Sequence, residues 1–430
     1  MSIKKKLGKK PKSLEKRVLL DLTKEICSSV NKISIAEAQS LNSSRPEHEI
    51  MLIERIDDIF YFDHDSCANL KKATKSIKHD PVYIDCISEE KIRNKYIDLI
   101  ISIIVGDTKS DQNIESAIDA YLAELKASVK GYRVLMPIEQ LELSDLEEVK
   151  IGKVRLVPFS HLKAEKQELS SSVGADDEKK IWGDVFITAE ATEAKSKGQR
   201  EIERVINLLR AYIPVLFHKE HNKKIGLLKY DPNSHYKYLI IEDLEISDEI
   251  RYLGPFGTYK LNKEKYEELR ANYCLDEISG MLSKEPSTRS DLENSIIMAI
   301  RWIGLGTDDE VASDKFLKYA IALECLLITR GEKGDKTDPI SKRAAFILGE
   351  SVIECSSIIS EVKLLYDIRS AIVHQGCEAE EEKYIEDSVQ KMYYYSMGTL
   401  LKLSNKTIGT DKWDDIQDLA LQMDEKMFER

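Results

Sequence analysis

Arg369 and His374 are the residues of this sequence whose types and spacing most directly suggest chemistry. Histidine titrates near neutral pH, so it can take a proton from a hydroxyl group or return one to a leaving oxygen. Arginine carries a permanent charge on a planar fork that matches the oxygens of a phosphate. Together they supply what RNA cleavage without a metal requires: a base, an acid and fixed positive charge beside the phosphate that the ribose 2′-hydroxyl attacks.

The spacing of this pair limits how one site could form. Five residues along an ideal helix rotate the second side chain by about 140° and advance it by about 7.5 Å. The two side chains therefore do not converge on one straight helix. Either the last turn is distorted before Gly376, or the same residues of a second subunit complete the site across a two-fold axis. We favour the dimer.

An arginine followed by a histidine is weak evidence by itself. Arg155 and His161 form a second match, in a strand-and-proline region without a helical pattern. The first pair also has a structural alternative, in which the arginine forms an ion pair with Glu361 or Asp367 and the histidine caps a helix end.

A helix ending at Gly376 would carry the first pair. Leu365, Ile368, Ile372 and Val373 keep an apolar stripe at helical spacing, and the glycine stands where a left-handed cap would end the helix. Upstream, Ser290 and Glu293 predict a capping box. Asp338 with Pro339 predicts a helix start, and Gly349 a helix end. After a polar linker at 284–289, five helices with short loops predict an all-α bundle; the expected ranges are 291–305, 313–330, 339–348, 357–375 and 380–403.

Four blocks of this bundle resemble a HEPN domain, specifically the ApeA-like branch. They are AIRWI (299–303), IALECLL (321–327), SKRAAFILG (341–349) and LYDIRSAIVHQG (365–376). The resemblance covers a little over a quarter of the chain. It implies a helical bundle that dimerises and cleaves RNA, such as tRNA or mRNA, without a metal or other cofactor, leaving a 2′,3′-cyclic phosphate.

The same resemblance implies roles for five residues of this sequence. Arg369 and His374 match the catalytic pair, and Ser370 matches the polar residue after the arginine, where asparagine or aspartate is commoner. Glu324 and Tyr366 are expected to support the site. Glu324 would either orient Arg369 or serve as a buried structural acid.

The upstream chain predicts two further regions, and the fold class is therefore mainly α with an α+β middle region. Residues 1–130 read as helical, with apolar residues such as Leu52, Ile53, Ile59 and Phe60 at helical spacing, behind a lysine-rich arm. Residues 131–283 read as an α+β domain. Its expected strands are 132–137, 152–158 and 182–188, with a polar loop at 163–180, extended stretches at 224–230 and 236–242, and a turn at 253–257. A helix is expected at 189–217, with one apolar face made of Ile202, Val205, Ile206, Leu209 and Tyr212. The bundle takes 284–405. Residues 406–430 predict an amphipathic helix that packs on the bundle or contacts a partner subunit.

Composition excludes several classes of protein. A net charge of -12 argues against a protein that coats nucleic acid non-specifically. No apolar run is long enough for a membrane span, and seven cysteines without a C-x-x-C pair predict neither a disulfide framework nor a zinc site. A cytoplasmic protein without membrane contact is expected. Asp63, His64, Asp65 and Cys67 could be metal ligands, but a surface turn is favoured.

The resulting expectation is a HEPN-type endoribonuclease held in check by its N-terminal region. Similar chains with long upstream regions are abortive-infection and anti-phage proteins, in which that region senses a phage-derived or cellular trigger. The alternative is a catalytically silent HEPN bundle that binds RNA or a partner protein. A purely structural oligomerisation domain is a third possibility.

Overall fold

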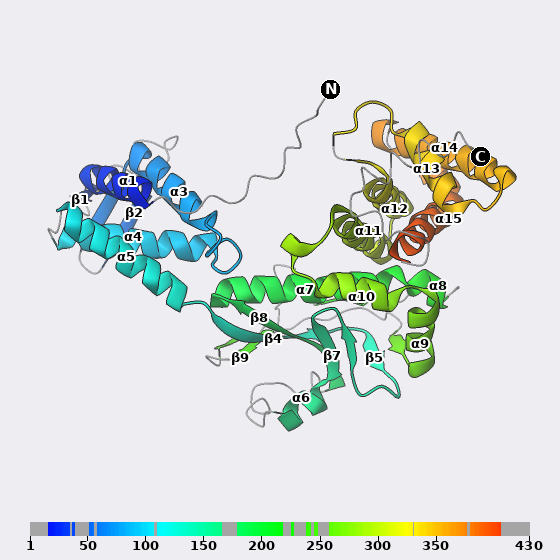
Figure 1. The fold of residues 1–430 in the computed structure, drawn as a ribbon, viewed down its shortest axis with the longest axis horizontal. Helices are drawn as coiled ribbons and strands as arrows, with labels where there is room; N and C mark the ends of the chain where they lie inside the picture. The colour runs from blue at the N-terminus through cyan, green and yellow to red at the C-terminus, as the bar shows by residue number, and fades with distance from the viewer. Residues whose placement is uncertain are drawn as a thin grey trace. The chain divides into compact units, whose positions relative to one another are not determined.

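The computed structural model describes residues 16–34, 37–38, 51–55, 58–106, 110–165, 179–217, 225–227, 238–241, 245–247, 258–329, 331–375 and 379–405. The chain is mainly helical with an α+β part, as the sequence predicts (Figure 1). Chain contacts divide it into two compact units. The first comprises residues 1–132 and 186–197, and the second residues 133–185 and 198–430.

The first unit combines four helices with a small antiparallel sheet in its described residues. The sheet has the strand order β1-β3-β2, and Asp63, Ser88 and Ser110 cap three of the helices through their side-chain oxygens. The elements are α1 (Lys16–Ser29), β1 (Asn31–Ile33), β2 (Met51–Arg55), β3 (Asp58–Phe62), α3 (His64–Lys78), α4 (Glu89–Val105) and α5 (Asp111–Ala127).

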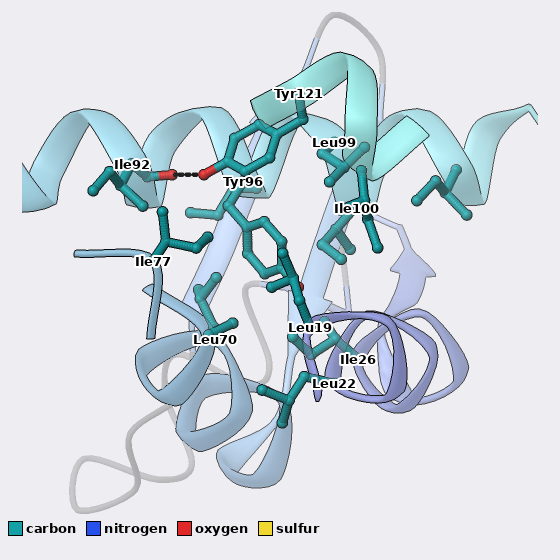
Figure 2. Packing of buried hydrophobic residues seen from close by; sticks show 14 of the residues in the cluster. Leu19, Leu22, Ile26, Leu70, Ile77, Ile92, Tyr96, Leu99, Ile100 and Tyr121 are labelled. Atoms are coloured by element: carbon teal, nitrogen blue, oxygen red, sulfur yellow. Dashed lines mark hydrogen bonds between the residues drawn. The ribbon is translucent and has the colours of Figure 1, made fainter. Parts of the chain in front are cut away.

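A core of its own holds this unit together. Apolar side chains of α1, α3, α4 and α5 meet in one buried cluster, shown in Figure 2. All three tyrosines of the cluster have bonded hydroxyl groups. Tyr121 donates to the Ile92 carbonyl at 3.0 Å, Tyr83 donates to the Leu122 carbonyl at 3.4 Å, and the Tyr96 hydroxyl lies 2.7 Å from that of Thr23. These hydrogen bonds satisfy polar atoms that burial would otherwise leave unpaired.

The prediction that this whole region is helical is wrong between residues 51 and 62. Leu52 and Ile53 lie in β2, and Ile59 and Phe60 lie in β3, where Ile53 faces Phe60 across the ladder. An apolar run of five residues fits the helical and the strand period equally well. Pairing with a neighbouring strand decides the outcome, and this cannot be read from either run alone.

The second unit is built on a six-stranded sheet with the order β10-β9-β4-β8-β7-β6, whose first and last strand pairs are antiparallel. β5 and β11 form a separate two-stranded parallel sheet. The strands are β4 (Lys130–Ile138), β5 (Leu141–Leu143), β6 (Val149–Ile151), β7 (Val154–Pro158), β8 (Ile181–Ala189), β9 (Tyr238–Ile241), β10 (Glu245–Ser247) and β11 (Tyr259–Leu261).

Three of the predicted strands are confirmed with shifted ends, and the shift at Gly152 has a physical cause. Gly152 has a φ of +60° in the turn between β6 and β7, a conformation that suits glycine. The strand therefore begins at Val154 instead of residue 152.

Helices of the second unit precede the bundle and pack on the sheet. In α7 (Ala191–Ala211), Gly198 fits against Val134 of β4, and Ile202 against Gly183 of β8. The helical face predicted from residue 202 to residue 212 is buried throughout. The remaining short helices are α6 (Phe159–Glu165), α8 (Ile213–Phe217), α9 (Lys263–Asn272), α10 (Leu275–Ser283) and the 3₁₀ turn η3 (Pro286–Thr288).

All five predicted helices of the C-terminal bundle are present. They are α11 (Asp291–Asp308), α12 (Ala312–Leu327), α13 (Thr337–Leu348), α14 (Val352–Gln375) and α15 (Ala379–Ser404). The capping box of Ser290 and Glu293 is confirmed. Asp338 is not the N-cap of α13, because this helix begins at Thr337, two residues before the predicted start, with Lys336 as its N-cap. Gly349 does end that helix, in an extended conformation.

Several predicted features lie outside the described residues. They are the lysine-rich arm at 1–12, most of the loop at 163–180, the turn at 253–257, the cap at Gly376 and the helix at 406–430. Of the helices that are described, none is both long and apolar enough to cross a membrane.

Candidate functional site

Helix α14 carries both residues of the candidate pair, on different sides. Arg369 is half-buried and points to α12, whereas His374 in the last turn is exposed. The described residues offer His374 no hydrogen bond or ion pair. One protomer therefore does not bring the two side chains together, as the helical rotation of about 140° predicts.

Glu324 of α12 is the ion-pair partner of Arg369. The Nη2 atom of Arg369 lies 3.3 Å from Oε1 of Glu324, with 31% and 17% of the respective side chains exposed. The pair suggested as an alternative, Arg369 with Glu361 or Asp367, does not form. Glu361 instead accepts a hydrogen bond from Tyr395 at 2.6 Å. A carboxylate on the neighbouring helix thus fixes the guanidinium at one of its nitrogen atoms.

The remaining donors of Arg369 leave capacity for another acceptor. Its Nε atom is buried and has no hydrogen-bond partner among the described residues. A buried unpaired donor is costly, so an acceptor at this position would be stabilised. The ammonium group of Lys336, 3.9 Å from Oε2 of Glu324, adds a second cation. Two cations around one carboxylate leave an excess of positive charge, which favours an anion.

Lys336 is the residue of this cluster that the sequence did not single out. It lies in the polar connection between α12 and α13, and only the fold brings it to Glu324. No local sequence pattern marks it, since its position as N-cap of α13 is known only from the structure and its side chain makes no capping hydrogen bond.

Tyr366 and Cys325 surround the ion pair without being available for acid–base chemistry. Tyr366 is buried, and its hydroxyl lies 3.5 Å from the Ala320 carbonyl. Burial, aided by the negative charge of Glu324, raises the pKa of Tyr366 well above its ordinary value. The same two causes raise the pKa of Cys325 to about 11. Both groups therefore keep their protons at neutral pH.

Ser370, which follows the arginine, has an exposed side chain on α14. Its hydroxyl is thus open to solvent, and it follows Arg369 of the ion pair directly in the sequence. The hydroxyl makes no hydrogen bond to any residue that the structure describes.

The second arginine–histidine match is occupied by other contacts. Arg155 of β7 donates from Nε to Asp184 at 2.9 Å and from Nη1 to Glu165 at 2.6 Å. Arg133 binds the same two carboxylates. His161 lies on the short helix α6. This arginine is therefore part of a structural ion-pair network on the sheet.

The surface turn predicted at residues 63–67 is wrong, because His64, Asp65 and Cys67 lie in the first turns of α3 and Cys67 is buried. Asp63 caps α3 by accepting a hydrogen bond from the Ser66 amide at 2.8 Å. In the described part of the chain, no three histidine, cysteine or acidic side chains gather as a metal site would require.

Comparison with known proteins adds no relative. A scan against protein-family models and searches of curated proteins and of solved structures find nothing that matches this chain.

Proposed function

We propose that this chain is a metal-independent endoribonuclease of the HEPN type. Arg369 would bind the scissile phosphate, and His374 would transfer the proton as the 2′-hydroxyl attacks. The observation that carries the proposal is the half-buried Arg369, anchored by Glu324 through one nitrogen and unpaired at Nε. An arginine held in this way keeps donors for a phosphate. The four sequence blocks that resemble a HEPN domain support the same reading.

The proposal assigns Glu324 a positioning role. Its carboxylate holds the guanidinium, and Lys336 offsets its charge. The incoming phosphate would then meet a fixed cation instead of a mobile one, which lowers the cost of ordering the site.

Two copies of α14 would complete the site in a homodimer. His374 shares the exposed side of this helix with Leu364 and Ile353, which are 53% and 83% exposed. Large apolar side chains on an exposed helix face favour a protein partner. A second copy packed over this side would bring the two His374 side chains to one interface, so that one histidine acts as base and the other as acid.

A cellular role follows from the resemblance. In this role the N-terminal region keeps the nuclease at a low basal activity until it senses a phage-derived or cellular trigger, in anti-phage defence or stress. The protein would act in the cytoplasm. Two contacts join the bundle to the end of α7: Tyr393 donates to the Ala211 carbonyl, and Arg210 pairs with Asp308.

The test uses the purified full-length chain with total RNA in EDTA. We expect fragments with 2′,3′-cyclic phosphate ends. His374→Ala and Arg369→Ala should each lower cleavage by about 10²-fold or more. His161→Ala is the matched control, because it removes an exposed histidine from the second arginine–histidine match.

Intact RNA with the wild-type chain would favour the rival function, a silent bundle that binds RNA or a partner protein. Two observations support this alternative: the overall charge of -12, and the separation of Arg369 from His374 within one protomer. Cleavage that survives His374→Ala would contradict the assignment of the site.

A further inference from the structure

A second site lies elsewhere in the second unit and is independent of the proposed nuclease. A half-open cavity of about 300 Å³ is lined by α8, the end of α11, the α11–α12 connection, α12 and α15. This volume is at the small end of the range for ligand pockets, enough for one ring system and an attached group. Six of the lining residues decide its chemistry: Tyr319, Tyr393, Tyr394, Lys315, Glu310 and Gln390.

Three tyrosines form an aromatic wall that is already ordered. The rings of Tyr319 and Tyr393 lie 5.4 Å apart, and those of Tyr393 and Tyr394 lie 5.8 Å apart, each pair in an edge-to-face arrangement. Tyr393 donates its hydroxyl to the Ala211 carbonyl at 2.8 Å, and the Tyr319 hydroxyl lies 3.1 Å from that of Thr307. Because these hydroxyls are engaged, the rings themselves remain to contact a ligand, with little ordering cost.

Tyr394 is the accessible member of this wall. It is 54% exposed, and Gln390 donates to its hydroxyl at 3.3 Å. Its ring offers a planar surface on which another aromatic ring could stack.

Lys315 gives the cavity its charge preference. The side chain is half-buried and makes no ion pair or side-chain hydrogen bond with any residue that the structure describes. Lys318, one turn further along α12, is by contrast paired with Asp309. Glu310, the acidic residue of the lining, is exposed. An ammonium group without a carboxylate partner in a cavity wall is suited to an anionic group of a ligand.

We propose that this cavity binds a small aromatic anion, a planar ring carrying one carboxylate or phosphate. The ring packs against the tyrosines, with Tyr394 as its accessible face, and the anionic group lies beside Lys315. Two sources share this chemistry, nucleoside monophosphates and aryl carboxylates.

Binding is measured by isothermal titration calorimetry with the full-length chain. The probes are AMP and indole-3-acetate, each paired with its neutral counterpart, adenosine and indole-3-acetamide. We expect at least one of the anions to bind with a dissociation constant of about millimolar or lower. AMP alone would identify a nucleotide site, and indole-3-acetate alone an aryl carboxylate site.

Variants then separate charge from stacking. Lys315→Gln should weaken the binding of the anion by about tenfold and leave the binding of its neutral counterpart unchanged. Tyr394→Ala should weaken the binding of both compounds by roughly threefold to tenfold. Glu310→Gln should strengthen the binding of the anion, because it removes a negative charge from the lining. Lys391→Gln is the matched control, an exposed lysine of α15 whose ammonium lies 3.6 Å from Glu361.

Three outcomes would overturn the proposal. They are the absence of binding by both anions, anion binding that Lys315→Gln does not alter, and tighter binding of the neutral compounds. A melting curve of each variant verifies that the chain is folded, since all of the substituted side chains are exposed or half-exposed.

Discussion

Arg369 and Glu324 connect α14 to α12 through a contact of 3.3 Å between Nη2 and Oε1, and the neighbouring Nε atom is buried without a partner. The guanidinium is therefore held from one side and unsatisfied on another. If the proposed nuclease is correct, this geometry makes Glu324 a positioning residue.

Glu324→Gln should lower RNA cleavage by about tenfold to hundredfold, because the guanidinium loses its anchor. The loss should appear in the single-turnover rate more than in RNA affinity. The melting temperature should change little, since a partly exposed ion pair contributes under about 1 kcal/mol. Glu361→Gln removes a carboxylate of α14 that does not contact Arg369 and serves as control. Equal rates in both variants would show that Glu324 is only structural.

Leu364→Glu should convert a dimer into monomers. The side chain is 53% exposed on the same side of α14 as His374, and a charge at the centre of an apolar interface is costly. Light scattering gives the mass in solution. Val105→Glu, at an exposed apolar position of the first unit, should leave the mass unchanged. A wild-type chain that is already monomeric would remove the basis for the shared site.

Arg210→Met should destabilise the second unit by about 3–5 kcal/mol, because it removes the buried guanidinium that pairs with Asp308 and donates a hydrogen bond to the Ile225 carbonyl. The two groups lie 3.1 Å apart with 9% and 6% of their side chains exposed. Replacing both, with Asp308→Leu added, should recover much of the loss. All three tryptophans fall in the sequence ranges of this unit, so their fluorescence follows its unfolding in denaturant. The exposed pair of Arg270 with Asp276 provides the control, as Arg270→Ala should leave the stability almost unchanged.

Two glycines within helices should respond in opposite directions to alanine. A Cβ atom at Gly304 would lie 2.3 Å from the carbonyl oxygen of Asn207, so Gly304→Ala forces α11 away from α7 and should cost at least about 1–3 kcal/mol. Gly280 has no atom within 4 Å of such a Cβ. Gly280→Ala should therefore stabilise α10 by about 0.5–1 kcal/mol. The same denaturant titration measures both, and a loss of equal size at the two positions would contradict the close helix contact.

Glu165 should make the second unit sensitive to acid. Hydrogen bonds from Arg155 and Arg133 lower its pKa to about 2, against the opposing effect of burial. Because the folded-state pKa lies below the ordinary value of 4.5, this carboxylate stabilises the fold fully above about pH 4.5. The contribution is lost as the pH falls toward 2. Glu165→Gln should flatten the decline in stability over that interval, whereas Glu264→Gln, at an exposed position of α9, should follow the wild type.

Local signals in the sequence predicted those parts of the fold that local interactions determine. The capping box of Ser290 and Glu293 and the apolar face from Ile202 to Tyr212 involve neighbours within a few turns. Such features follow from the helical period and from capping chemistry. The hairpin of β2 and β3 did not follow, because its short runs fit two periods and their pairing is a tertiary fact.

The candidate site shows the same division. Its residue types and the helix that carries Arg369 could be predicted from the sequence. The contact with Glu324, 45 positions earlier in the chain, was suggested only by the resemblance. The approach of Lys336 could not be predicted, because it depends on how α12 and α13 pack against α14. Spacing did predict that Arg369 and His374 diverge, since it follows from helix geometry alone.

The bundle and α7 are not separate modules, although the polar segment at 284–289 lies between them in the chain. Arg289 ends that segment, and it is buried with hydrogen bonds to the carbonyls of Met281, Leu282 and Lys284. Further along, Tyr393 of α15 binds the end of α7 at the Ala211 carbonyl. A protease that nicked the chain at residues 284–289 would thus yield two fragments that stay associated. By the same reasoning, a gene fusion that contained the bundle without α7 would expose the bundle surface that α7 covers. Recombination that preserves the fold would therefore keep the bundle and α7 together.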